Sequence, residues 1–266
     1  MSLSIDPSKA KKITVDVELD FVEKQTTRAD PIQAVSELIW NSLDAEASEV
    51  HVEFEFNDLA GGLSKIYIID NGTGFSHEEA TSLFGKIGGS WKRQKRQTPK
   101  LRRMIHGQEG KGRYKAFSLG KSVEWKVRHL NENDRIEVFS LGVLSNSLKS
   151  VFVTEPTYPE NVVETGVVVE ITDIEKQFKK LISDEGIQEF SEIFAPYLIN
   201  YKDVQIVING ERINPSEAVG GVPFIVETRG GLMSLMFDLW VWCKFLSGTR
   251  AAKALLSRMG LKLVGD

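Results

Sequence analysis

The sequence predicts an α+β domain built on a mixed, mostly antiparallel sheet. Between residues 30 and 85, helical and strand patterns alternate along the chain. From residue 121 onward, short strand patterns follow one another across short turns, which implies antiparallel pairing. With 266 residues and 41% hydrophobic content, the chain is long enough for one large domain, or for one domain and part of a second.

Residues 30–45 are predicted to form an amphipathic helix. Asp30 suits the N-cap, Pro31 the first helical position, and Gln33 the third position of a capping box. Apolar side chains spaced three and four residues apart form one stripe along this helix: Ile32, Val35, Ile39 and Leu43.

A second stripe on the same helix is polar. Glu37, Asn41 and Asp44 are four and three residues apart, which places them on one side, roughly opposite the apolar stripe. This pattern fits an ordinary solvated face. However, residues 31–45 contain no Lys or Arg, whereas a solvated face usually mixes both charges. An acid and amide surface is also what a metal ion or an attacking water requires.

A predicted strand leads into a glycine-containing turn. This strand, residues 63–69, ends in Asp70-Asn-Gly72-Thr-Gly74. The turn is either a plain Asn-Gly hairpin or a pocket mouth where Asp70 faces a ligand and the glycines allow close approach. Because Ser76 and Glu79 form a capping box that begins another helix, the pocket is favoured over the hairpin.

The remaining elements follow from the same patterns. The other predicted strands cover residues 13–22, 50–56, 123–130, 135–141, 150–154, 167–172 and 204–208. Two further helices are predicted at residues 177–182 and 187–198.

Residues 85–112 are the least regular part of the chain. They include a basic run, residues 92–103, with seven Lys and Arg. This run is either a solvated mobile loop or a contact for polyphosphate, nucleic acid or an acidic partner. Gly107, Gly110 and Gly112 predict a glycine-rich turn that leads into a helix, an arrangement suited to phosphate.

Composition narrows the class of protein. The net charge of −4 does not fit a chain that is a nucleic-acid-binding polycation as a whole. The single cysteine, Cys243, excludes an internal disulfide and a cysteine-based zinc site, and favours the reducing cytoplasm. No run of about 18 apolar residues is present, so no membrane span is expected.

Taken in order, these motifs resemble those of the GHKL ATPases: gyrase, ninety-kilodalton heat-shock chaperones, histidine kinases and MutL, with MORC proteins as relatives. Glu37-Leu-Ile-Trp-Asn41-Ser-Leu-Asp44-Ala45 is similar to the N-box. Asp70-Asn-Gly72-Thr-Gly74-Phe and Gly107-Gln-Glu-Gly110-Lys-Gly112 are similar to the first and second glycine boxes. Lys86-Ile-Gly-Gly-Ser90 resembles the motif before the chaperone lid. The resemblance covers roughly residues 15–175.

The resemblance implies a Bergerat-type two-layer sandwich with helices on one face of the sheet, and a site for ATP and Mg²⁺. It also implies roles for the N-box: Asn41 binds Mg²⁺, Glu37 is the general base, and Asp44 lies in the pocket wall. In the first glycine box, which includes Gly72 and Gly74, Asp70 accepts from the adenine amine and Gly74 allows the adenine ring to approach. Gly107, Gly110 and Gly112 bind the phosphates, and Lys86 precedes a lid at residues 85–106.

The same resemblance separates hydrolysis from phosphotransfer. Histidine kinases generally lack the glutamate four residues before the N-box asparagine, so Glu37 favours hydrolysis. For an ATPase of this kind, we expect nucleotide to close the lid and drive dimerisation. A nucleotide-binding module with a basic loop and a histidine-kinase-like domain remain the alternatives. Thr165 precedes Gly166, the reverse of the family order, and receives no role. Chaperone, DNA-repair, MORC-like and anti-phage functions all fit the same motifs equally well.

The expected domain division lies near residue 214. Residues 1–214 are predicted to form the ATP-binding domain. Residues 215–266 resemble no complete domain, although relatives usually carry a second domain whose lysine reaches the γ-phosphate. We interpret this segment as a truncated transducer domain or as a terminus altered relative to relatives, with a partner-binding helix as the alternative.

Overall fold

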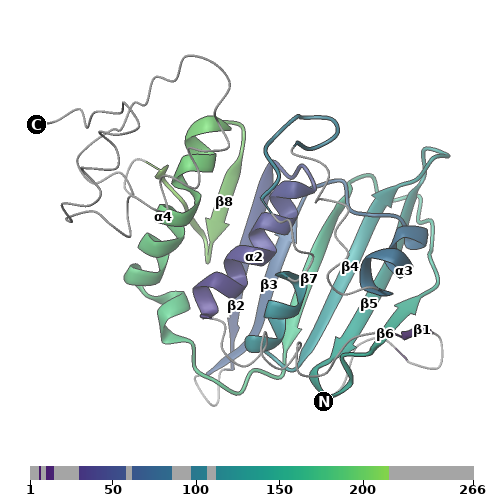
Figure 1. Cartoon of the computed structure of the whole chain (residues 1–266), viewed down its shortest axis with the longest axis horizontal. Helices are drawn as coiled ribbons and strands as arrows, with labels where there is room; N and C mark the ends of the chain where they lie inside the picture. The colour runs from purple at the N-terminus through teal and green to yellow at the C-terminus, as the bar shows by residue number, and fades with distance from the viewer. Residues whose placement is uncertain are drawn as a thin grey trace, which may run out of the picture.

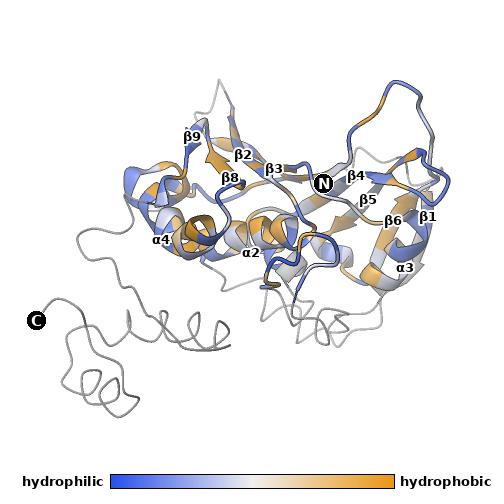
Figure 2. Ribbon diagram, turned by 90° about the horizontal axis from the view of Figure 1, so that it is seen from above, coloured by the Kyte–Doolittle hydropathy of each residue, from blue (hydrophilic) through white to orange (hydrophobic). Residues whose placement is uncertain are grey.

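The computed structural model describes residues 6, 10–14, 30–57, 62–85, 97–106 and 112–215. These residues form a sheet of nine strands with helices packed on one face (Figures 1 and 2). The strands are β1 (Ala10–Thr14), β2 (Glu49–Phe56), β3 (Leu63–Asp70), β4 (Ser122–Leu130), β5 (Ile136–Leu144), β6 (Ser150–Thr154), β7 (Gly166–Thr172), β8 (Gln205–Ile208) and β9 (Glu211–Arg212). The α-helices are α2 (Pro31–Asp44), α3 (His77–Gly85) and α4 (Asp184–Asn200), and the 3-10 helices are η3 (Gly112–Ser118), η4 (Ser145–Ser147) and η5 (Lys179–Ile182).

The strand order across the sheet is β1-β6-β5-β4-β7-β3-β2-β8-β9. Strand β8 runs parallel to β2, and the other paired strands of the described chain are antiparallel. The prediction of a mixed, mostly antiparallel sheet with helices on one face is therefore confirmed.

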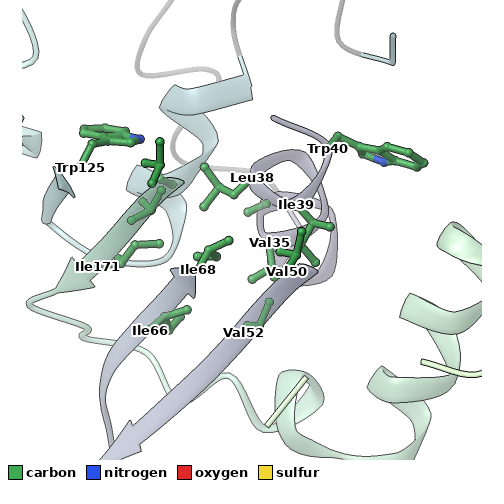
Figure 3. Packing of buried hydrophobic residues seen from close by; sticks show 14 of the residues in the cluster. Val35, Leu38, Ile39, Trp40, Val50, Val52, Ile66, Ile68, Trp125 and Ile171 are labelled. Atoms are coloured by element: carbon green, nitrogen blue, oxygen red, sulfur yellow. The ribbon is translucent and has the colours of Figure 1, made fainter. Parts of the chain in front are cut away.

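Helix α2 begins as its sequence predicts and lies over the centre of the sheet. The Asp30 carboxylate accepts hydrogen bonds from the backbone N–H groups of Ile32 and Gln33, at 2.8 and 3.3 Å. Val35 and Ile39 point toward the apolar side chains of β2 and β3 (Figure 3). Burial of each such side chain contributes about 1.5–3 kcal/mol, which fixes the helix and hence its polar residues on the sheet.

The polar stripe of α2 does not lie on an open face. Helix α4 covers the side of α2 that carries Trp40, and the Trp40 ring lies 4.7 Å from that of Phe194 and 5.4 Å from that of Tyr197. Asp44 is also buried, with 4% of its surface exposed. The expectation that the polar stripe lies opposite the buried face therefore holds only for Glu37 and Asn41, which are half-buried.

Helix α3 begins with the predicted capping box. The Ser76 hydroxyl accepts from the backbone N–H of Glu79 at 3.0 Å, and the Glu79 carboxylate accepts from the backbone N–H of Ser76 at 2.9 Å. The Asp70 turn therefore leads into a helix, and the alternative of a plain hairpin is wrong.

Several predicted elements differ in extent. Strand β1 begins before the predicted strand at residues 13–22, and residues 15–29 lie outside the described part of the chain. The helix predicted at residues 177–182 is only the short η5, and the second glycine box leads into a 3-10 helix, η3, rather than an α-helix. From Ile66 to Asp70, strand β3 alternates between buried and half-buried residues, because helices cover only one face of the sheet.

The domain division predicted near residue 214 stays a prediction, because residues 216–266 lie outside the described residues. Within the described part of the chain, no helix is both long and apolar enough to cross a lipid bilayer.

Candidate functional site

Asp70 is held at the junction of three elements, although it is the last residue of β3. Its Oδ2 accepts a hydrogen bond from the Ser42 hydroxyl of α2 at 2.7 Å. Its Oδ1 accepts from the backbone N–H of Gly72 at 2.9 Å and from that of Val167, in β7, at 3.1 Å. Only 5% of its surface is exposed. The carboxylate is thus fixed in direction and is linked to the helix that carries the polar stripe.

Burial raises the pKa of Asp70 above the ordinary range of an aspartate. The hydrogen bonds from Ser42, Gly72 and Val167 act in the opposite direction, and so does the charge of Arg128, but burial outweighs them. A carboxylate has about four acceptor positions, and these three donors leave one for a further donor.

The first glycine box is shaped by contacts within the protein. Gly74 has a φ of +61°, and a side chain there would meet the backbone oxygen of Arg128 at 2.8 Å. A Cβ at Gly72 would lie 2.7 Å from the backbone oxygen of Ala45, at the end of α2. Both positions therefore require glycine for packing, whether or not a ligand also approaches them.

Asn71 ties this box to the chain between α2 and β2. Its Oδ1 accepts from the backbone N–H groups of Ser48 and Glu49, each at 2.9 Å. Its Nδ2 donates to the Ser48 hydroxyl at 2.9 Å. The N-box and the first glycine box, which are separated by some thirty residues in the sequence, therefore form one rigid corner.

Glu37 is paired with a lysine from η3. The Lys115 Nζ donates to Oε1 of Glu37 at 2.6 Å, and both side chains are about one-quarter exposed, at 23% and 30%. Helices α2 and η3 pack against each other. The structure thus brings the first residue of the polar stripe to the segment that follows the second glycine box.

Asp44 reaches residues predicted to belong to the lid. Its Oδ1 accepts from the backbone N–H of His106 at 2.9 Å. The His106 ring stacks on Trp40 with 4.0 Å between centroids. The C-terminal end of the predicted lid therefore rests on α2.

Residues 97–106 are also fixed by a buried glutamate and a buried arginine. Oε1 of Glu46 accepts from the backbone N–H groups of Lys100 and Leu101, each at 2.7 Å. Arg103, with 2% exposed, donates to the backbone oxygen of Ala47 at 2.6 Å and pairs with Asp203 at 2.5 Å. This half of the predicted lid is a docked segment.

Other predicted residues lie outside the described part of the chain. They are Lys86, Gly107 and Gly110, together with residues 92–96 of the basic run. Gly112 is the first residue of η3. Near Thr165, it is the backbone N–H of Val167 that contacts Asp70, and the role of Thr165 itself stays open.

Sequence reasoning missed Ser42, Lys115 and His106. Ser42 was detectable, because it lies four residues after Leu38 and three after Ile39, on the buried side of α2, where a hydroxyl requires a partner. Lys115 and His106 carried no such signal, since their partners lie far away in the sequence.

Comparison with known proteins identifies the family. The model of the family described as histidine kinase-, DNA gyrase B-, and HSP90-like ATPase matches residues 29–179, more than half of the chain. The chain belongs to this family. The matched residues include both glycine boxes and helix α2, and membership of this family supports ATP binding and hydrolysis in general terms.

Curated relatives share shorter segments. The chain is 39% identical over 54 residues to the DNA mismatch repair protein MutL of Staphylococcus epidermidis, which is 20% of this chain and 8% of that protein. It is 43% identical over 56 residues to MutL of Shouchella clausii, covering 21% and 8%. With MutL of Chlamydia trachomatis it shares 35% over 77 residues, covering 29% and 12%. The similarity thus spans only a small part of each relative.

Proposed function

We propose that this chain is a Mg²⁺-dependent ATPase in which Asp70 recognises adenine and Glu37 activates the attacking water. The observation that carries the proposal is the buried, oriented carboxylate of Asp70, joined through Ser42 to the helix that holds Glu37 and Asn41.

Asp70 suits an adenine ring. Two backbone N–H groups and one hydroxyl hold its carboxylate in place, and one acceptor position is left for an exocyclic amine. The hydrogen bonds from Val167, Gly72 and Ser42 act against the effect of burial and favour the ionised form, which is the stronger acceptor for an amine.

The oxygens of α2 suit a hard cation and a water molecule. The amide oxygen of Asn41 is a ligand type that Mg²⁺ accepts, and Mg²⁺ usually takes only one or two protein oxygens, with the rest from water and phosphate. When bound, it neutralises charge on the transferred phosphoryl group. Glu37, one helical turn earlier, orients and deprotonates the attacking water. Asp44 lines the pocket beside them and holds the backbone of His106.

The second glycine box completes the proposed site. Backbone N–H groups at Gly107, Gly110 and Gly112 cradle the phosphates, and Lys86 precedes the lid. Nucleotide orders the lid and drives formation of a homodimer, so the chain acts as a clamp or switch. The mismatch-repair relatives support a MutL-like role among the possible pathways.

Turnover and binding in three proteins test the proposal. The wild-type chain is expected to hydrolyse ATP at millimolar Mg²⁺, Glu37→Ala to bind ATP without turnover, and Asp70→Asn to lose binding. A folded wild-type chain that neither binds nor hydrolyses ATP would refute it.

A second candidate function is nucleotide-dependent binding of nucleic acid or an acidic protein through the basic residues 92–103. It is favoured by the seven Lys and Arg in that run and by the names of the relatives. DNA affinity measured against salt concentration tests it, since phosphate contacts predict a steep decline. Affinity that is absent or independent of salt would exclude the nucleic-acid version.

Phosphotransfer of the histidine-kinase type is the third alternative, because the matched family includes such enzymes. Incubation with γ-labelled ATP distinguishes it from hydrolysis. Release of labelled phosphate without any labelled protein supports the ATPase.

A further inference from the structure

We infer that Lys115 is the positioning residue for the general base, holding the Glu37 carboxylate in the orientation that hydrolysis requires. The inference rests on the proposed function and assigns a role to a residue outside the N-box and the glycine boxes. Its basis is the hydrogen bond of 2.6 Å from the Lys115 Nζ to Oε1 of Glu37.

The cation comes from a segment whose backbone is firmly fixed. Tyr114 and Ala116, on either side of Lys115, are 3% and 0% exposed. The backbone oxygen of Lys115 accepts from the Ser118 hydroxyl at 2.7 Å. The ammonium group therefore extends from an anchored position, which lowers the entropy lost when it orients a partner.

The base has no cation of its own on α2. Residues 31–45 contain no Lys or Arg, so an ordinary ion pair along the helix is impossible. Glu37 is half-buried and can adopt several side-chain rotamers unless a partner selects one. Because Lys115 occupies Oε1, the other carboxylate oxygen is left for water.

A lysine in this place acts on the base and not on nucleotide binding. Adenine recognition depends on Asp70, which is fixed by Ser42, Gly72 and Val167 without help from Lys115. Loss of Lys115 should therefore slow the chemical step and leave ground-state affinity unchanged, as for an interaction that matters only in the transition state.

Lys115→Met tests this, because methionine retains the apolar length of the side chain and removes the charge. We expect kcat to fall on the order of 10- to 100-fold, as for a misplaced catalytic group. The affinity for a non-hydrolysable ATP analogue should stay within about twofold of wild type. Lys115→Arg, which restores a cationic donor, should recover part of the lost kcat.

A matched control is Lys126→Met. Lys126 pairs with Glu170 at 2.7 Å on the sheet face away from the helices, and its removal should leave both kcat and affinity unchanged. In a Glu37→Gln background, Lys115→Met should cause no further loss, because the group that it positions is already gone.

Each other result overturns the inference. Weaker analogue binding with unchanged kcat would make Lys115 a phosphate ligand, and faster turnover would make it an inhibitor of the base. If Lys115→Met shows unchanged kinetics while wild type and Lys126→Met are active, the positioning role of Lys115 is rejected and the ATPase proposal stays intact. An inactive wild-type chain would reject both.

Discussion

At the scale of residues, two carboxylates of the site are held by opposite physical means. Asp70 is deeply buried, and its donors among the described residues are neutral: the Ser42 hydroxyl and two backbone N–H groups. Glu37 is half-buried and accepts from a charged donor, Lys115. A buried carboxylate among neutral donors keeps a high affinity for a proton, which links its function to pH.

Nucleotide affinity is expected to depend on the ionisation of Asp70. Burial raises the pKa of Asp70, so protonation stabilises the folded chain at low pH, and that contribution is lost as pH rises through the folded-state pKa. The ionised form, present above that pKa, is the stronger acceptor for the adenine amine. Affinity for an ATP analogue, measured by calorimetry, should therefore increase with pH through an ionisation above the usual carboxyl range.

Two variants make this prediction specific. Asp70→Asn should bind weakly at every pH, while its thermal stability at neutral pH stays close to wild type, since the amide oxygen can still accept from Gly72 and Val167. Asp134→Asn, in an exposed turn, should retain the wild-type profile. A pH-independent affinity in the wild-type chain would contradict the role of Asp70.

At the scale of elements, α2 and the segment of residues 97–106 behave as one unit. Glu46, directly after the helix, accepts from the backbone of Lys100 and Leu101, while Asp44 accepts from that of His106. The C-terminal end of α2 therefore anchors residues 97–106. Movement of the lid, if nucleotide drives it, must begin before residue 97 or break these contacts.

The anchor predicts a pH-dependent stability. Burial acts to raise the pKa of Glu46, but hydrogen bonds from Leu101, Thr98 and Lys100 together hold it below its ordinary value. A lowered pKa means that Glu46 stabilises the fold above its unfolded-state pKa, and that this contribution is lost as pH falls through the folded-state value. Glu46→Gln should lower the free energy of unfolding by about 1 kcal/mol at pH 7, because a charge-assisted hydrogen bond becomes a neutral one.

Urea denaturation at neutral and at strongly acidic pH measures this difference. The gap between Glu46→Gln and wild type should close in acid, where the wild-type glutamate is protonated. Glu132→Gln, in an exposed turn, should match wild type at both. An equal loss for Glu46→Gln at both pH values would show that charge is not what anchors the segment.

At the scale of the whole molecule, the candidate site lies at one corner of the sheet. Helix α2, the end of β3 and the start of β7 meet at Asp70, while β4, β5 and β6 extend the sheet away from that corner (Figure 1).

Nucleotide-dependent dimerisation is the prediction at this scale. With Mg²⁺ and a non-hydrolysable ATP analogue, the mass of the chain measured by light scattering should double relative to the nucleotide-free sample. Asp70→Asn should stay monomeric under both conditions, because it does not bind the analogue. If the wild-type mass is the same with and without nucleotide, the clamp is excluded and hydrolysis by a single chain is left.

The sequence by itself determined the elements and the family. A period of two residues identified β2 and a period of about 3.6 identified α2, because these periods record which side of an element is buried. The order of three short motifs indicated the ATPase family, which the family match confirms. It also located Asp70 at a strand end, where tertiary contacts then fixed its direction.

Tertiary structure alone decided how the site is held together. The pairings of Asp70 with Ser42, Glu37 with Lys115, and Glu46 with the backbone near Lys100 each join segments at least 28 residues apart. Such contacts depend on the rotation of α2 on the sheet and on the register of β3 with β7, which no local pattern encodes. The same reason explains why Asp44 was expected on an open stripe and is instead covered.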